Sequence, residues 1–331
     1  MRPDEVDDRG LFLVQDLEIR SKVLPLFRIN PQSPNERPAG HGTTFRIDPW
    51  CMCATAFHVI EELVEYCETQ QNVRIRPDVA LAALEFPGIV YGTVAIPRDW
   101  WRPLEGMSSS HVRIENRPLQ PITIRNLSEL AALWISPSPQ HKGASEYFDL
   151  DQRWTPEIGD QVMALGYADL DVDTHGRGEQ RPMEQYVYGS VSEIIELEPP
   201  DVERGRPWPM MRVQANWPGG MSGGPVFNTE GKVVGVVSTG FPGHDIATAT
   251  FFSAWEIPRQ TFQSLDPANP GWFYCIGVFD AEERIRWVGP DGSEASRFAD
   301  DQNLSDVRAI SFNPVSQEYI TIRRIPPGTS R

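Results

Sequence analysis

Short apolar runs rich in Val, Ile, Phe and Tyr recur along the chain, and this pattern constrains the fold more than any other feature. Turn-forming residues bound the runs, and the 30 prolines and 26 glycines are spread over the whole length. Many short strands separated by turns are typical of β-sandwiches and β-barrels. We therefore predict an all-β fold. The predicted strands before the C-terminal region are residues 23–29, 41–47, 73–75, 79–86, 89–96, 130–135, 161–167, 186–197, 210–215, 232–238 and 248–255.

Helical periodicity is scarce. One predicted helix follows His58, because the apolar residues of 60–67 recur at the i, i+3, i+4, i+7 spacing of a helix face. A second short helix is predicted at 259–265. Two polar stretches, 98–117 and 137–159, are predicted to be loops.

The charge balance excludes several kinds of partner. Acidic residues outnumber basic ones 46 to 30, for a formal net charge of −16, so we expect no nucleic-acid or anionic-membrane partner. There is no apolar run of about 18 residues that would predict a membrane helix. Residues 1–20 lack the basic and apolar regions of a secretory signal. These features indicate a cytoplasmic protein.

The four cysteines predict neither a disulfide framework nor a metal site. Cys51 and Cys53 are too close for an ordinary bridge, and no second Cys/His pair offers zinc a complete ligand set. We interpret them, with Cys67 and Cys275, as buried thiols of a reducing compartment. The acidic segment 169–181 lacks the Gly and Glu of a calcium loop. We therefore expect no metal and no cofactor.

The strongest chemical signal is the sequence Gly-Met-Ser-Gly-Gly-Pro at 220–225. An acyl-transfer serine needs its Oγ exposed on a tight turn, with backbone N–H groups aimed at the developing oxyanion. Glycines allow that backbone conformation and a close approach to a substrate carbonyl. The motif predicts Ser222 as a nucleophile, with the N–H groups of Gly220 and Ser222 as the oxyanion hole. A plain hairpin turn is the alternative reading of these residues alone.

The residues after this motif extend it into a family resemblance. A Glu-Gly turn at 230–231 leads into Lys-Val-Val-Gly-Val-Val-Ser-Thr-Gly at 232–240. This arrangement resembles the trypsin/chymotrypsin superfamily of serine proteases and its bacterial high-temperature-requirement members. The resemblance implies two six-stranded β-barrels with the active site in the cleft between them. It also implies that Ser238, Thr239 and Gly240 form the edge that pairs with a substrate backbone.

Two earlier segments resemble the strands that carry the base in this superfamily. Residues 54–59 read Ala-Thr-Ala-Phe-His-Val, similar to its T-A-A-H motif, and 40–45 read Gly-His-Gly-Thr-Thr-Phe, similar to its G-x-G-x-x-F strand. An isolated histidine in an apolar stretch is more often a core residue, but here the matches occur in the family order. The resemblance therefore implies His58 as the general base, since histidine accepts and returns protons near neutral pH.

The acid of the triad is less clearly marked. Residues 129–135 read Glu-Leu-Ala-Ala-Leu-Trp-Ile, which resembles the family's D-I-A-L-L-x-L strand with Glu129 in the place of the acid. Glutamate can orient a base histidine, as it does in some hydrolases of other folds. Asp149, Asp151 and Asp99 remain open as alternatives, as does a site with no functional acid.

Several departures from the family affect activation and specificity. The disulfide of the animal members is missing, because Thr43 and Val59 stand at its two positions. Met221 replaces the Asp that receives a newly freed N-terminus in trypsins, so activation by N-terminal cleavage is not expected. By spacing, the floor of the specificity pocket falls near Asn216. Asn216 carries no charge, so a trypsin-like preference for basic residues is not supported there.

These motifs lead to a functional hypothesis. We expect a bacterial serine endopeptidase that hydrolyses protein or peptide substrates through an acyl-enzyme, held in check by a regulatory protein partner or a signal. The alternative is a peptide-binding pseudoprotease without turnover, motivated by the Glu129 and Met221 departures. The α/β-hydrolase elbow also contains Gly-x-Ser-x-Gly, but it requires a helix where Pro225 and a predicted strand follow.

The predicted domain organisation has three parts. A lead-in covers 1–21, and the protease domain covers 22–266, with one barrel at 22–128 and the other at 129–266. Residues 267–331 form a small β-rich extension that the resemblance does not explain. Its predicted strands are 272–279, 284–288, 307–312 and 319–323.

Overall fold

The computed structural model describes most of the chain. The described residues are 5–33, 36–48, 52–67, 72–86, 88, 96–114, 123–136, 146–170, 185–201, 206–240, 245–252, 264–266, 268–269, 272–289, 292–313, 316 and 318–325.

Six strands close the first barrel in the order β2-β3-β4-β9-β8-β7, and every neighbouring pair is antiparallel where its register is given. Buried apolar side chains from several of these strands, including Leu26, Phe45 and Leu133, fill its interior. A two-stranded sheet of β5 and β6 lies outside the barrel. The strands are β2 (Val23–Ile29), β3 (Ala39–Arg46), β4 (Met52–Ala56), β5 (Val64–Cys67), β6 (Asn72–Ile75), β7 (Ala80–Leu84), β8 (Trp101–Ile114) and β9 (Thr123–Ile135).

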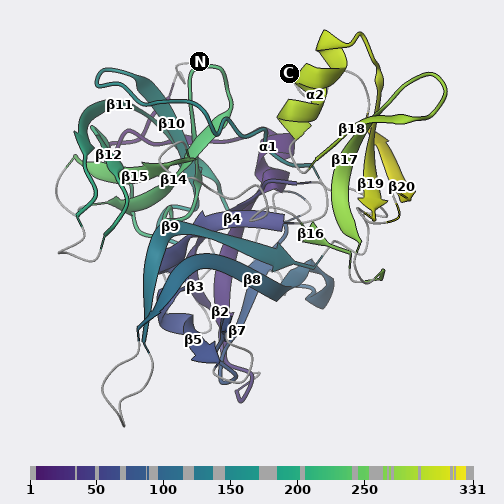
Figure 1. Cartoon of the computed structure of the whole chain (residues 1–331). Helices are drawn as coiled ribbons and strands as arrows, with labels where there is room; N and C mark the ends of the chain where they lie inside the picture. Colours follow the sequence, from purple (N-terminus) through teal and green to yellow (C-terminus); the bar gives the residue numbers. More distant parts are fainter. Residues whose placement is uncertain are drawn as a thin grey trace.

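The second barrel is a sheet in the order β11-β10-β13-β14-β15-β12 that closes because β11 also pairs with β12. A short N-terminal strand, β1 (Phe12–Leu13), adds to the outer side of β11. Figure 1 shows the two barrels one above the other. The strands are β10 (Gln161–Gly166), β11 (Tyr188–Glu198), β12 (Met210–Val213), β13 (Pro225–Phe227), β14 (Val233–Gly240) and β15 (Ala247–Phe251).

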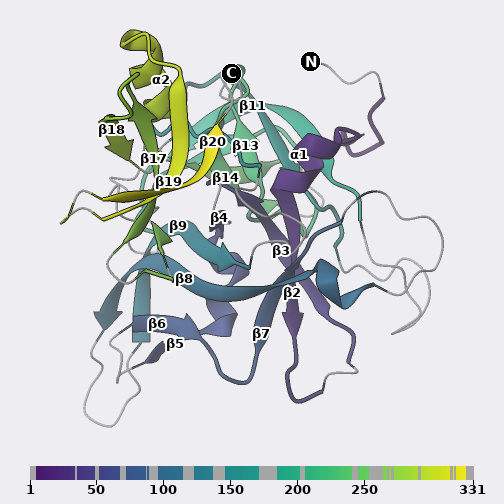
Figure 2. The ribbon, with the colours of Figure 1, turned by 90° about the vertical axis from the view of Figure 1, so that its right-hand side faces the viewer.

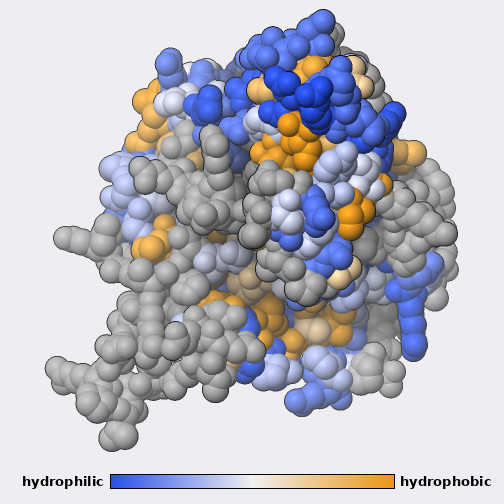
Figure 3. All heavy atoms as spheres, turned by 45° about the vertical axis from the view of Figure 1, so that its right-hand side comes forward, coloured by the Kyte–Doolittle hydropathy of each residue, from blue (hydrophilic) through white to orange (hydrophobic). Residues whose placement is uncertain are grey.

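The C-terminal extension is a separate sheet with one helix. The strand order is β16-β17-β19-β20, with β18 also paired to β17. The helix α2 (Gly292–Asp301) packs on the sheet through Ala295 and Ala299, while its outward face is hydrophilic (Figure 3). The strands are β16 (Ser264–Leu265), β17 (Phe273–Phe279), β18 (Ile285–Gly289), β19 (Asp306–Phe312) and β20 (Tyr319–Ile325).

The segment 146–154 connects all three parts. The Phe148 N–H donates to the Arg46 carbonyl of the first barrel at 3.0 Å, and the Asp151 N–H donates to the Val233 carbonyl of the second at 2.8 Å. Arg153 lies 3.6 Å from Glu294 of the extension. Figures 1 and 2 both place the extension beside the barrels, separate from either.

The structure confirms the all-β, two-barrel prediction but corrects some local predictions. The predicted loop 98–117 is instead the 3-10 helix η3 (Arg98–Trp100) followed by β8. Its polarity misled the prediction, because the buried Arg102 is paired with Glu85, with 2.6 Å between Arg102 Nε and Glu85 Oε2.

The predicted helix after His58 is also wrong. The chain forms the 3-10 helices η1 (Phe57–Val59) and η2 (Glu61–Leu63), and then enters β5. Ile60 and Leu63 are both fully buried. Their i, i+3 spacing suits the three-residue turn of a 3-10 helix as well as an α-helix.

The predicted internal boundary between residues 128 and 129 lies inside β9, which belongs to the first barrel up to Ile135. The lead-in contributes β1 and the helix α1 (Leu17–Lys22) to the folded structure. The helix predicted at 259–265 falls mainly outside the described residues, and its last two residues are β16. Most of the predicted strand 89–96 also lies outside them.

The structure also bears on the predicted buried thiols and on membrane-spanning helices. Cys53, Cys67 and Cys275 are buried thiols, and Cys51 lies outside the described residues. Within the described part of the chain, no helix is both long and apolar enough to cross a membrane.

Candidate active site

His58 lies just beyond the end of β4, in the 3-10 helix η1. Its neighbours Phe57 and Val59 are buried in the first barrel, at 2% and 3% exposure. The His58 side chain is 35% exposed, so the tight turn directs it away from the core that holds its neighbours.

Glu129 lies in an irregular part of β9. Ser109 of β8 pairs with Ala131 and His111 pairs with Asn126, so residues 127–130 stand opposite a single residue of β8. A bulge of this kind changes the direction in which a strand points its side chains. On the other side, Leu130 pairs with Ala56 at the end of β4, which brings Glu129 next to His58.

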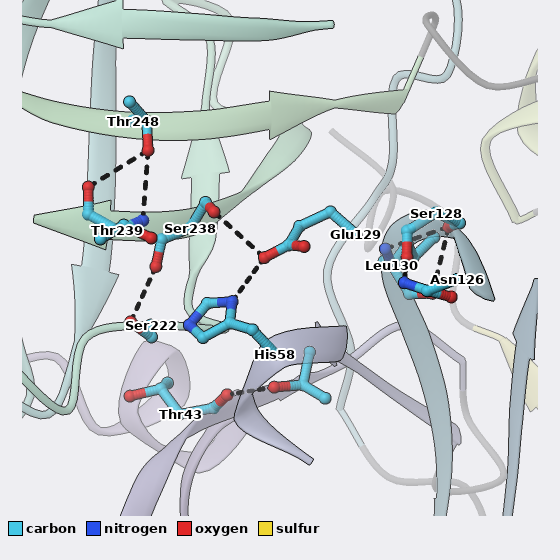
Figure 4. A network of polar contacts seen from close by, with 11 residues as sticks. Thr43, His58, Asn126, Ser128, Glu129, Leu130, Ser222, Ser238, Thr239 and Thr248 are labelled. Carbon is cyan, nitrogen blue, oxygen red and sulfur yellow. Dashed lines mark hydrogen bonds and ion pairs between the residues drawn. The ribbon is translucent and has the colours of Figure 1, made fainter. Parts of the chain in front are cut away.

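The three predicted catalytic residues gather at one place (Figure 4). His58 Nδ1 is hydrogen-bonded to Glu129 Oε1, and the Glu129 side chain is only 6% exposed. The Ser238 hydroxyl donates a second hydrogen bond to the same Glu129 oxygen, at 3.0 Å. The other ring nitrogen of His58 faces Ser222 (Figure 4). Glu129 can therefore fix the orientation of the imidazole.

The Ser222 hydroxyl is engaged by backbone in this structure. It donates to the Ser238 carbonyl at 2.8 Å, and no hydrogen bond joins it to His58, both residues being described. Hydrogen bonds of a catalytic site are often long or misaligned before substrate is bound. The Ser222 hydroxyl must therefore turn away from the Ser238 carbonyl to reach the imidazole.

The turn that carries Ser222 is fixed to β14. The Gly223 N–H donates to the Val237 carbonyl at 2.8 Å, and the Val237 N–H donates to the Gly224 carbonyl at 2.9 Å. Gly223 has a φ of 85°, and a Cβ there would lie 2.1 Å from Thr55 Oγ1. Glycine is required at this position because both the backbone conformation and the space exclude a side chain.

The turn that carries Ser222 has two backbone donors without a described acceptor. Among the described residues, the N–H groups of Gly220 and Ser222 donate no hydrogen bond to protein atoms. Buried or half-buried N–H groups are usually paired, so two adjacent unpaired donors suit a site that binds an oxyanion.

Thr43, which the sequence motifs did not single out as functional, ties the first barrel to the nucleophile turn. It is fully buried, and its N–H donates to the Ser222 carbonyl at 2.8 Å. Its Oγ1 donates to the Gly220 carbonyl at 2.7 Å and accepts from the Tyr167 N–H at 3.0 Å. No sequence signal could have shown these contacts, because they join segments far apart in the chain.

The residues predicted to bind substrate lie around the same turn. Ser238 is buried, with its hydroxyl on Glu129 and its carbonyl on Ser222. Thr239 is exposed, and its carbonyl accepts from Thr248 Oγ1 at 3.2 Å. Gly240 lies against the Trp217 backbone, where a Cβ would come within 2.0 Å of the Trp217 carbonyl oxygen. Asn216 is partly exposed just before Trp217.

The alternative acids have other partners. Asp151 accepts from the N–H groups of Arg153 and Trp154, each at 3.0 Å, and so closes a local turn. Asp149 lies on the connecting segment 146–154, where its carbonyl accepts a hydrogen bond from the Val233 N–H. Asp99 lies in η3. Of the four candidates, Glu129 is the one that contacts His58.

A second histidine lies close to the first. His41 of β3 is mostly buried, with its Nε2 3.7 Å from Glu62 Oε1. Burial lowers the pKa of His41, and this outweighs the opposing effect of the Glu62 carboxylate. His41 therefore favours the neutral form beside His58.

The closed barrels and the Ser/His/Glu arrangement define a two-barrel peptidase of the trypsin-like class. Residues 42–236, more than half of the chain, match the family model described as the trypsin-like peptidase domain. The chain belongs to this family.

The chain is also similar to solved structures. The crystal structure of Deg5 has 14% sequence identity to this chain and a TM-score of 0.41. The match covers 71% of this chain and 85% of that chain. The active form of the Rv3671c protease from M. tuberculosis is 16% identical over 72% of this chain and 79% of that chain, with a TM-score of 0.40. No curated protein matches the sequence.

Proposed function

We propose that the chain is a serine endopeptidase that hydrolyses peptide bonds through an acyl-enzyme formed on Ser222. The observation that carries the proposal is the contact of the half-exposed His58 with the buried Glu129, next to Ser222. The turn of Ser222 has two N–H groups, those of Gly220 and Ser222, that donate to no described residue. Each group required for acyl transfer is therefore present at one point.

The chemistry follows from this arrangement. Ser222 Oγ attacks the substrate carbonyl carbon while its proton passes to His58 Nε2, and Glu129 holds the imidazole through Nδ1. The N–H groups of Gly220 and Ser222 stabilise the oxyanion. His58 then gives the proton to the leaving amine as the C–N bond breaks. Water, activated by His58, hydrolyses the acyl-enzyme.

The Ser222–Ser238 hydrogen bond favours a second candidate function. A nucleophile held by a backbone carbonyl instead of its base is what a peptide-binding pseudoprotease would also show. Under the first proposal, substrate binding releases this hydroxyl. Under the second, peptide binds without covalent chemistry. Control by a protein partner would reconcile a latent Ser222 with an active enzyme.

Fluorophosphonate labelling of the purified full chain tests the proposal. Ser222 attacks phosphorus and fluoride leaves, so a stable adduct reports an assembled Ser/His pair. We expect labelling of the wild type and none of the Ser222→Ala and His58→Ala variants. Cleavage of internally quenched peptides then tests endopeptidase activity. A wild type that binds peptides but is neither labelled nor catalytic would support the pseudoprotease.

A further inference from the structure

The N-terminal segment forms a closed turn on the second barrel. The Asp7 carboxylate accepts from the N–H groups of Arg9 and Leu11, at 3.0 and 2.8 Å. The Asp7 N–H donates to the Leu11 carbonyl at 2.8 Å, and Leu11 is buried in the core of that barrel. Phe12 then pairs with Gly189, where a Cβ would lie 2.2 Å from the Phe12 ring. Residues 7–12 therefore have a fitted seat on the second barrel, and we call them the N-terminal clasp.

Arg9 connects the clasp to the loop after β10. Its Nη1 forms an ion pair with Asp169 Oδ2, and its Nε lies 3.0 Å from Asp7 Oδ2. Burial opposes the charged form, but the hydrogen bonds that Arg9 donates to the Asp169 and Asp7 carboxylates raise the pKa of Arg9. Both side chains of the Arg9–Asp169 pair are about one-third exposed, so the pair contributes little to global stability. We therefore expect the Arg9–Asp169 pair to act by positioning the groups bonded to it.

Asp169 is bonded to the loop that precedes the nucleophile. Its N–H donates to the Gly219 carbonyl at 2.7 Å, and its φ is 55°, a conformation that few residues other than glycine adopt. In a trans peptide the carbonyl and the next N–H point in opposite directions. When Asp169 holds the Gly219 carbonyl, the Gly220 N–H is directed away from Asp169 and stays free to bind an oxyanion.

Nothing else described holds this peptide in the same way. Gly220 has a φ of 93° and lies so close to the Tyr167 carbonyl that a Cβ there would be 2.4 Å from its oxygen. Glycine permits rotation of the Gly219–Gly220 peptide, and the rotated peptide would present a carbonyl in place of the Gly220 N–H. The hydrogen bond from Asp169 opposes that rotation.

We propose that Arg9 and Asp169 are positioning residues for the oxyanion hole, and that the clasp holds the Gly219–Gly220 peptide in its productive orientation. This inference rests on the proposed peptidase function. Under this inference, the clasp contributes to catalysis through the Arg9 side chain, and no freed N-terminus is required. Met221, at 0% exposure, offers no charge for such a terminus to bind.

The test compares Arg9→Gln and Asp169→Asn with the wild type. Both substitutions remove one charge of the pair, and asparagine tolerates the positive φ at 169. Arg74→Gln is the matched control, because Arg74 binds Glu65 through two nitrogens, at 2.9 and 2.7 Å, on the exposed surface of β5 and β6. The readouts are the fluorophosphonate rate constant, kcat and KM for a peptide, the thermal unfolding midpoint and the NMR titration of His58.

We expect each clasp variant to lose roughly 10-fold to 100-fold in labelling rate and in kcat, with KM nearly unchanged. The His58 titration and the unfolding midpoint should stay close to those of the wild type. The double variant should be no slower than the worse single variant, because both act through one contact. Arg9→Lys should recover part of the rate.

Two results separate the possible failures. If the wild type is neither labelled nor active, the peptidase proposal fails for the chain on its own, and the positioning role fails with it. If the wild type is labelled and both clasp variants are labelled at the same rate, the peptidase proposal stands and the positioning role is overturned. The positioning role would also be overturned if Arg9→Gln and Asp169→Asn were labelled more slowly, unfolded at a lower temperature and had a raised KM. These three changes together indicate a general structural effect.

Discussion

At the scale of single residues, Glu129 is the departure from the family that most affects the chemistry. Its carboxylate receives two hydrogen bonds, from His58 and from Ser238, and both come from groups next to Ser222. A glutamate on an irregular section of strand thus reaches the imidazole that an aspartate reaches in the family. Residues 127–130, which include this longer side chain, are out of register with β8.

Replacing Glu129 by Gln should lower kcat by about 10³-fold to 10⁴-fold, since the amide cannot hold the imidazole in the required tautomer or stabilise the imidazolium. Glu129→Asp keeps the charge but shortens the side chain, so we expect an intermediate loss. Steady-state peptide hydrolysis across pH measures both.

Glu65→Gln is the control for this prediction. Because Glu65 pairs with Arg74 on the surface, this variant should have the kcat of the wild type. Full activity in Glu129→Gln would show that the imidazole is oriented without an acid, one of the possibilities that the sequence left open.

The sequence identified the residues that lie together at the candidate site better than it identified the residues that support them. Ser222, His58 and Glu129 are found through short local motifs whose residue types are dictated by chemistry. Other contacts join segments more than a hundred residues apart. They are the hydrogen bond from Ser238 to Glu129 and the contacts of Thr43 with the nucleophile turn. Local pattern contains no information about such contacts.

At the scale of secondary structure elements, β3 supports the nucleophile turn through one side chain. Thr43 and Thr44 are adjacent on this strand, and both are fully buried with hydroxyls that donate to backbone carbonyls. The Thr43 hydroxyl binds the Gly220 carbonyl, whereas the Thr44 hydroxyl binds the Ala54 carbonyl of β4, at 2.8 Å. The two residues therefore form a natural pair of test and control.

Thr43→Val and Thr44→Val should each destabilise the protein by about 1–3 kcal/mol, because each removes a buried hydroxyl that donates to a backbone carbonyl. Only Thr43→Val should also slow fluorophosphonate labelling, by roughly 10-fold, because it frees the Gly220 carbonyl and the Tyr167 N–H. Denaturant unfolding and labelling kinetics measure the two effects. Equal labelling rates in the two variants would mean that β3 does not position the turn.

Strands were predicted well where an apolar run fills a barrel, as in β2 and β10, and poorly where charges are paired inside. β8 contains Pro103, Gly106 and a serine run, which are typical of loops. It forms a strand because β7 and β9 satisfy its backbone on both sides. That pairing is a tertiary effect that overrides local propensity.

At the scale of the whole molecule, the limits of the parts could not be predicted from composition. The lead-in looks like a polar tail, yet its two-residue strand and Leu11 belong to the second barrel. The helix α2 was missed because its few apolar side chains, the buried Ala295 and Ala299 and the partly buried Phe298, lie in a short stretch that is otherwise polar and acidic. Each of these elements is stabilised by what it packs against and not by its own sequence.

The C-terminal extension contains a titratable centre at the start of its sheet. The Asp266 carboxylate is buried and accepts hydrogen bonds from Ser311 Oγ at 2.5 Å, from Asn269 Nδ2 at 2.8 Å and from Tyr274 Oη at 3.1 Å. Burial raises the pKa of Asp266, but these hydrogen bonds outweigh it and lower the pKa below its ordinary value. Burial, and then the neighbouring Asp266 carboxylate, raise the pKa of Tyr274 to about 12.

These two shifts predict opposite limits for the stability of the extension. The contribution of the Asp266 carboxylate is complete above its unfolded pKa of roughly 4, and it is lost as the pH falls through the lower folded value. The contribution of Tyr274 is complete below about pH 10 and is lost as the pH rises toward its folded pKa of about 12. Hydrogen exchange of β17, compared across pH, measures the stability of this sheet without interference from the barrels.

Asp266→Asn should weaken protection of β17 by about 1.5–3 kcal/mol at neutral pH, because a charged acceptor of several hydrogen bonds is lost, and it should flatten the acid limb. Tyr274→Phe should instead flatten the alkaline limb. Tyr319→Phe is the control, because among the described residues the Tyr319 hydroxyl has a single long, exposed contact, of 3.4 Å with the Glu283 carbonyl. This variant should leave both limbs as in the wild type. Protection in Asp266→Asn that still falls with acid as in the wild type would assign the acid limb to other carboxylates. Because Asp266 joins β16 to the strands that follow it, the same measurement shows whether the extension unfolds independently while Ser222 is still labelled by fluorophosphonate.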